Sequence, residues 1–363
     1  MAYTNIDDPS AFFQVALYNG TASDNNVITN DGNSDLQPDW LFFKHRTAST
    51  QDWYVVDSSR GSTKGLATNT SAAETTSSSS TKDFQSFNTD GFTVGTPENT
   101  DACNSIGTKA AWQWKCNGGT TSSNTDGSIT STVQANQDAG FSIVTWTGNT
   151  TGSSQTIGHG LGAAPKTIIV KDRDSTAVWV SYHEPLGTGK YLQLHSNAAQ
   201  GSISNYWSST APSSTVFGVI GDNGGAGYAN NVSGNDMIAY CFAEKQGYSK
   251  FGSYIGNGST NGPFVYTGFK PAFIMRKRTD GSGGWDILDY KRDPTNLADQ
   301  FLTANANSAE SNYLDIFSID ILSNGFKFRT SRYESNQSGS TYIYMAFAEN
   351  PFTTSTGIPT TAR

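Results

Sequence analysis

The feature that most constrains the fold of this chain is a pattern of residues that occurs three times. Each copy has a proline that is followed six residues later by a lysine: Pro38–Lys44, Pro165–Lys171 and Pro271–Lys277. A tryptophan follows each lysine: Trp53, Trp179 and Trp285. A closing aromatic residue lies 76 or 77 residues after each proline: Trp114, Phe242 and Phe347. Agreement this close over such a distance indicates an internal repeat, which sets the frame for every later prediction.

The repeat predicts how the chain divides. We expect repeated units at residues 12–117, 140–248 and 250–352, each near the size of one β-sandwich, which is about 100 residues. The Gly/Ser/Thr/Asn-rich segment 118–139 has little apolar surface to bury and is predicted to be a linker. Residues 353–363 are predicted to form a C-terminal tail.

Composition and local patterns favour an all-β fold. Charged residues make up only 15% of the chain, which argues against a helical bundle, and 20 Phe, 16 Tyr and 8 Trp argue against disorder. Thr167–Val170 is a short apolar run bounded by polar residues, as in a buried strand. Asp90-Gly91 and Asn324-Gly325 favour tight hairpin turns. We therefore expect three tandem β-sandwich units, of jelly-roll or concanavalin-like type.

Charge and cysteine content exclude several classes of partner. The chain has 23 Lys and Arg against 31 Asp and Glu, a net charge of −8, and lacks the basic cluster that nucleic-acid binding needs. No apolar run is long enough for membrane insertion, and the first residues do not resemble a signal peptide. Three cysteines without a Cys-x-x-Cys pair indicate neither a disulfide framework nor a zinc site. We expect production in a reducing cytoplasm and no cofactor.

The histidines are poor candidates for catalysis. His183 lies where the other copies carry Asp57 and Asp289, so it reads as a variable position of a repeated scaffold. His195 lies within a repeated Leu-x-x-Asn turn, which we align as Leu66–Asn69, Leu194–Asn197 and Leu302–Asn305. The glycine-rich segment around His159 lacks the strand-then-helix context of a phosphate loop. We therefore predict that the protein is not an enzyme.

Other polar motifs have both a structural and a ligand-binding interpretation. Residues 30–35 and 221–225 offer oxygen ligands for Ca²⁺, although Asn, Asp and Gly also simply form turns. The repeated lysines are expected to pair with Asp57 or Asp289 across the sheet. Three aromatic residues in polar loops are the candidates for stacking on sugar rings: Tyr206, Trp207 and Tyr228.

Several segments resemble a known family. They are residues 1–4, the Pro-x-Trp-x-x-x-Lys-x-Arg unit at Pro38 with its later Asp57-x-x-Arg60, and the segments 157–166 and 256–271. These sequence segments are similar to those of a family of uncharacterised marine bacteriophage structural proteins, described as tail-fibre, appendage or virion components. The resemblance covers nearly the whole chain and implies a phage particle as the setting, without catalytic or binding residues to carry over.

The sequence and the resemblance together predict a non-enzymatic virion protein, made in the host cytoplasm and displayed as a tail fibre, tail appendage or head decoration. Its expected partners are other virion proteins, further copies of itself (a trimer would suit a fibre) and host-surface polysaccharide. One alternative is a free carbohydrate-binding module. A second is a fibre-borne polysaccharide depolymerase, an activity that needs a pair of carboxylates in a cleft.

Overall fold

Almost all regular structure in the chain is β-strand. The computed structural model describes residues 4–48, 50–149, 153–202, 206–208, 210–220, 230–312 and 317–360. Strands account for 43% of the residues and helices for 3%, which confirms the all-β prediction. Short helical segments that lie entirely within the described residues are η1 (Pro9–Ala11), η2 (Glu184–Leu186) and α2 (Tyr333–Asn336).

Three large antiparallel sheets dominate the fold. In spatial order, the first sheet contains β1 (Phe13–Gly20), β9 (Gly107–Trp114), β3 (Trp40–His45) and β4 (Tyr54–Asp57). The second contains β10 (Ser122–Asn124), β11 (Ser131–Asn136), β12 (Phe141–Thr147), β18 (Asp236–Phe242), β14 (Thr167–Asp172), β15 (Val180–His183) and β16 (Leu192–Gln193). The third contains β19 (Ser249–Ile255), β27 (Thr341–Pro351), β21 (Phe269–Arg278), β22 (Trp285–Asp289), β23 (Gln300–Thr303) and β24 (Ser311–Asn312).

Smaller sheets accompany the large ones. One contains β2 (Asn26–Ile28), β8 (Phe92–Val94) and β7 (Phe84–Phe87). Another pairs β13 (Ser154–Gly158) with β17 (Val216–Ile220). A third contains β20 (Phe264–Tyr266), β26 (Gly325–Phe328) and β25 (Ile319–Leu322). A short hairpin joins β5 (Lys64–Gly65) to β6 (Thr75–Thr76).

The large sheets share one order of four neighbouring strands: β1-β9-β3-β4, β12-β18-β14-β15 and β19-β27-β21-β22. Their registers also agree. The residue two positions after each repeated proline lies opposite the closing aromatic residue: Trp40 opposite Trp114, Thr167 opposite Phe242, and Phe273 opposite Phe347. The landmarks spaced along the sequence are therefore paired positions within the sheets.

Each large sheet is buried on both faces. On β3, Phe42 belongs to one hydrophobic cluster, while Leu41 and Phe43 belong to another that also contains residues of the small sheet β2-β8-β7. On β14, Ile169 faces the first of these clusters and Ile168 faces a separate one. Because alternate residues of a strand point to opposite faces, burial on both sides explains why these strands read as continuous apolar runs.

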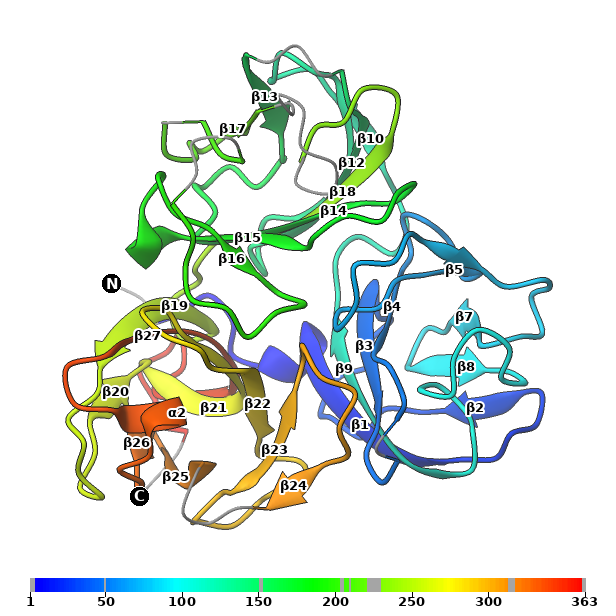
Figure 1. The fold of residues 1–363 in the computed structure, drawn as a ribbon. Helices are drawn as coiled ribbons and strands as arrows, with labels where there is room; N and C mark the ends of the chain where they lie inside the picture. Colours follow the sequence, from blue (N-terminus) through cyan, green and yellow to red (C-terminus); the bar gives the residue numbers. More distant parts are fainter. Residues whose placement is uncertain are drawn as a thin grey trace.

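A common aromatic core lies where the three large sheets meet. Figure 1 shows the sheets around one centre, with the blue strands of the first sheet on the right, the green strands of the second above and the yellow-to-red strands of the third at lower left. The ring centroids of Trp114 and Phe347 are 5.5 Å apart, and those of Phe242 and Phe347 are 5.8 Å apart. Trp40 lies 5.5 Å from Phe242. Aromatic residues of all three sheets thus share one core.

The prediction that residues 118–139 form a linker was wrong for part of this segment. Part of this segment forms β10 and β11, which extend the second sheet beyond β12. On β11, Ser131 and Val133 are buried while Thr132 between them is exposed. A strand needs only backbone partners and one half-buried face, so a segment rich in Ser, Thr and Asn can complete a sheet.

Candidate functional site

The repeated tryptophans connect the large sheets to one another. Each indole Nε1 donates to a backbone carbonyl at the edge of a different large sheet. Trp53 donates to Thr303 at 3.0 Å, Trp179 to Ala67 at 2.9 Å and Trp285 to Gln193 at 2.9 Å. The first sheet thus contacts the third, the second contacts the first, and the third contacts the second. The contacts run in one direction around the centre and close a ring.

The repeated lysines do not pair with the repeated aspartates, and that expectation was wrong. Each ammonium group donates instead to a backbone carbonyl in a loop of the neighbouring sheet: Lys44 to Asn307, Lys171 to Ser71 and Lys277 to Asn197. In the register of the two strands, Asp57 lies opposite Trp40. Trp40 precedes Lys44 by four residues, which places the two positions about 13 Å apart along the strand. Burial lowers the pKa of all three lysines to about 8, and a nearby carboxylate acts in the opposite direction on each of them: Asp52 on Lys44, Asp172 on Lys171 and Asp286 on Lys277.

A buried charge network joins the first sheet to the second. Asp57 Oδ2 accepts hydrogen bonds from Arg60 Nε at 2.5 Å and from the Tyr240 hydroxyl at 2.7 Å. Glu74 accepts from both Arg60 and Arg173, each at 2.9 Å. The side chains of Asp57 and Arg60 are fully buried. Burial alone would raise the pKa of Glu74, but the hydrogen bonds from the two arginines lower it overall.

The corresponding network joins the third sheet to the first. Asp289 Oδ2 accepts from Arg292 Nε at 2.5 Å and from the indole of Trp112 at 3.0 Å. Glu310 accepts from Arg292 at 2.7 Å and from Arg46 at 2.6 Å. The Arg292 guanidinium also lies 5.3 Å from the centre of the Trp112 ring. Two of the three contacts between sheets therefore contain the same Asp–Arg–Glu–Arg arrangement.

The contact between the second and third sheets is built differently. His183 occupies the aspartate position, and Leu186 occupies the arginine position three residues later. The buried His183 ring places Nε2 3.0 Å from the carbonyl oxygen of Tyr344 on β27. Gln200 replaces the glutamate and bonds to this neighbour only through its backbone N–H, which donates to Thr279 O at 2.8 Å. This contact is therefore formed without a buried ion pair at these positions.

Acidification is expected to destabilise the protein through His183. Burial lowers the pKa of His183 to about 4, whereas an unfolded histidine titrates near ~6.5. Between these values the unfolded chain binds the proton more readily, so this stabilisation is complete above about pH 6.5 and is lost as the pH falls toward about 4. The full effect corresponds to about 3 kcal/mol. Urea unfolding at pH 7 and pH 4.5 measures it, and the His183→Asn variant should lose correspondingly less stability. An identical loss in wild type and variant would contradict the assignment.

His195 has a structural partner that the sequence alignment missed. In each copy, the residue two positions after the tryptophan has a leucine as its partner in the β-ladder. These leucines are Leu66, Leu192 and Leu302. The aligned turn of the second copy therefore begins at Leu192 rather than at Leu194, a correction of two residues. In this register His195 Nδ1 accepts from the backbone N–H of Trp179 at 3.4 Å. Asn69 and Asn305 accept the equivalent bonds from Trp53 and Trp285.

Two of the three aromatic residues proposed for sugar stacking, Tyr206 and Trp207, lie inside the fold. Tyr206 is 1% exposed and Trp207 is 5% exposed. Their rings pack against Tyr191 and Tyr182, with centroids 4.5 and 5.8 Å apart. Tyr228 lies outside the described residues. Neither Tyr206 nor Trp207 presents an open ring face at the surface in this structure.

Of the two loops considered as cation sites, residues 30–35 and 221–225, the structure describes only the first. Residues 221–225 lie outside the described residues. In the other loop, the Asn30 side chain bonds to Leu36 O and to Gln113, and Asp31 pairs with Lys291 at 2.5 Å. Within the described ranges, no group of three or more His, Cys, Asp and Glu side chains is placed to hold a metal ion. The side chains of Asn30 and Asp31 are therefore already bonded to protein groups, including Gln113 and Lys291, which lie far away in the sequence.

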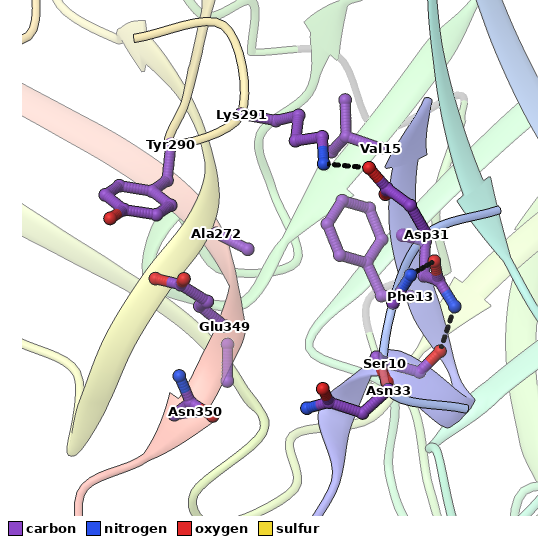
Figure 2. Close-up of a pocket in the computed structure, with 13 residues that line it drawn as sticks. Ser10, Phe13, Val15, Asp31, Asn33, Ala272, Tyr290, Lys291, Glu349 and Asn350 are labelled. Carbon is purple, nitrogen blue, oxygen red and sulfur yellow. Dashed lines mark hydrogen bonds and ion pairs between the residues drawn. The ribbon is translucent and has the colours of Figure 1, made fainter. Parts of the chain in front are cut away.

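A surface cleft of about 270 Å³ lies between the first and third sheets. Figure 2 shows Phe13 and Asp31 on one side of it, with Tyr290 and Glu349 on the other. The acidic groups are already paired, because Lys291 binds Asp31 and Lys270 binds Glu349 at 2.7 Å. The Lys270 ammonium also covers the Tyr290 ring at 3.4 Å. The cleft is thus a junction of ion pairs rather than a site with a free acid and base.

A second cleft, of about 300 Å³, has exposed aromatic side chains that sequence reasoning missed. It is lined by Tyr266, which is 60% exposed, and by Phe352, which is 39% exposed. The ion pair between Glu244 and Lys250, at 2.7 Å, lines the same cleft. The available signal was the alternation in β20, where Phe264 and Tyr266 point outward on either side of a buried valine.

None of the helices in the described part of the chain has the length and apolarity to cross a bilayer. The family model for DUF7483, a domain of unknown function, matches residues 8–351. No curated protein and no solved structure matches the chain.

Proposed function

Since the chain belongs to the DUF7483 family, whose description assigns no function, we propose one from the architecture: a non-enzymatic structural protein of a bacteriophage particle. The observation that carries the proposal is the closed ring of buried contacts among the three large sheets. In this proposal the chain consists of three tandem β-sandwich units, each formed by one large sheet and its smaller partner sheet.

The common strand order supports the three-unit interpretation. The order β1-β9-β3-β4 recurs in the second and third sheets, and each large sheet shares a hydrophobic cluster with strands of one small sheet. The units would begin near the first strand of each sheet, except that β10 and β11 assign part of the predicted linker to the second unit. A rigid body with three similar sides is suited to repeated contacts in a particle.

The use of the charged groups supports a structural role. The repeated lysines, the aspartates at positions 57 and 289 and the arginines at positions 60 and 292 all bond to neighbouring protein groups. Within the described residues, these recurring groups form hydrogen bonds and ion pairs to protein atoms, many of them between sheets. A catalytic acid or base instead needs access to substrate.

The virion setting rests on the sequence resemblance and on the surface. The chain is poor in charge, and a neutral, hydroxyl- and amide-rich surface does not depend on interactions that salt screens. Display as a tail fibre, tail appendage or head decoration fits this composition. Host-surface polysaccharide is the proposed partner of the exposed rings in the cleft at Tyr266 and Phe352, because sugar rings bind to aromatic faces and polar groups together.

The decisive experiment is mass spectrometry of purified phage particles. The protein should sediment with intact virions, in a constant ratio to the major capsid protein across the gradient peak. A non-structural phage protein from the same lysate serves as the control and should be depleted. Absence of the chain from intact particles would refute the proposal. Glycan-array binding by the isolated protein, or halo formation on host lawns, would then favour the carbohydrate-binding or depolymerase alternatives.

A further inference from the structure

Three buried polar atoms without a partner surround one small cavity between the second and third sheets. They are Thr167 Oγ1, Ser181 Oγ and His183 Nδ1. The three residues are 4%, 2% and 3% exposed. Met275 and Trp285 of the third sheet line the opposite wall. Buried polar atoms in native proteins nearly always have a hydrogen-bond partner, so a cluster of three points to a bound molecule.

The cavity arises from residues that differ among the three sheets. The ladder registers make Thr167, Ser181 and His183 equivalent to Trp40, Val55 and Asp57 of the first sheet and to Phe273, Ile287 and Asp289 of the third. A threonine therefore stands where the other sheets have a large aromatic ring, and a serine stands where they have an aliphatic side chain. The second sheet has lost volume and gained hydroxyl groups at the same place.

The chemistry of His183 defines what the bound molecule must provide. Its Nε2 faces the Tyr344 carbonyl oxygen at 3.0 Å, and because a carbonyl only accepts, Nε2 carries the hydrogen. Neutral Nδ1 is then an acceptor and requires a donor. The hydroxyls of Thr167 and Ser181 can both donate and accept. The site needs a small neutral molecule that donates at least one hydrogen bond and accepts others.

We propose that this cavity binds one water molecule, which donates to His183 Nδ1 and bonds to the hydroxyls of Thr167 and Ser181. The cavity volume of about 10 Å³ is close to the space that a single water needs. Three protein partners match the usual two to four bonds of a buried water. The water takes the place of the ionic bridge at the other two contacts and makes this contact neutral and polar.

The test is the substitution Thr167→Val, which removes the hydroxyl while nearly preserving the shape of the side chain. If the water is bound, it loses a partner, and the folding equilibrium constant of the full chain should fall about tenfold in urea unfolding. If the hydroxyl is unpartnered, the same change should leave stability unchanged or raise it. Thr132→Val, at an exposed position of β11, is the matched control and should have little effect.

A second measurement keeps the proposal falsifiable if Thr167→Val perturbs folding in another way. A high-resolution crystal structure of the wild-type protein should show one water within hydrogen-bonding distance of all three atoms. The Ser181→Val variant, which introduces the residue found at position 55, should displace or shift that water. An empty cavity in the wild-type structure would overturn the proposal.

Discussion

Replacing Trp114 with alanine is expected to lower the free energy of unfolding by about 3–5 kcal/mol, the range for removing a buried aromatic side chain. Trp114 is 1% exposed and packs against rings of the first and third sheets. Its centroid lies 4.9 Å from Phe13, 5.6 Å from Phe273 and 5.5 Å from Phe347. The variant therefore opens a cavity where the sheets meet. Equilibrium unfolding in urea, monitored by circular dichroism, measures the loss.

Tyr266→Ala is the control for this prediction. Tyr266 is also aromatic, but it is 60% exposed and lies outside the common core. Its replacement should change stability by no more than about 0.5 kcal/mol, as is usual for surface positions. Limited proteolysis should also cut the Trp114→Ala variant faster than the control variant. Equal stability of the two variants would show that the aromatic core does not hold the sheets together.

Replacing Arg60 with methionine is expected to cost about 3–5 kcal/mol, because it leaves the buried Asp57 carboxylate without its cation. Asp57 loses the 2.5 Å contact and is fully buried, while Glu74 keeps only its partner Arg173 and the half-exposed Lys64 nearby. Methionine fills a similar volume, so the loss reports charge rather than a cavity. Thermal and urea unfolding at neutral pH provide the measurement.

Two further variants separate the possible causes of that loss. Arg332→Met removes an arginine that is 49% exposed and lies 3.7 Å from Glu334, and it should have an effect below about 1 kcal/mol. The double variant Asp57→Asn/Arg60→Met removes the unpaired carboxylate as well and should recover part of the stability. An Arg60→Met protein as stable as Arg332→Met would contradict a role for the network in holding the first and second sheets together.

The all-β class was predictable because the relevant signals are local. Apolar runs such as Thr167–Val170, and turn pairs such as Asn324-Gly325, depend on neighbours in the sequence. The spacing of the closing aromatic residues indicated a repeat, but it did not predict strand pairing. That Trp114 and Phe347 lie opposite the positions two residues after their prolines is seen only in the structure.

The partners of the charged side chains were not predictable in the same way. Lys44 has an aspartate nearby in the pattern, but its ammonium binds the carbonyl of Asn307, a residue of a distant loop. That choice depends on how the sheets pack around the centre, and the pattern within one copy contains no information about it. The burial of Tyr206 depends on the hydrophobic cluster between the second large sheet and its small partner sheet, which the polar residues around it in the sequence do not indicate.

The ring of contacts also sets a constraint on synthesis. Trp53 donates to the carbonyl of Thr303, which lies 250 residues later in the chain. During synthesis, the side of the first sheet that contacts the third sheet therefore lacks its packing partner. It is covered only after most of the chain has left the ribosome. Contacts so distant in sequence form late and slowly. Until the third sheet docks, the nascent protein exposes aromatic surface, which makes this interval its period of greatest exposure to aggregation.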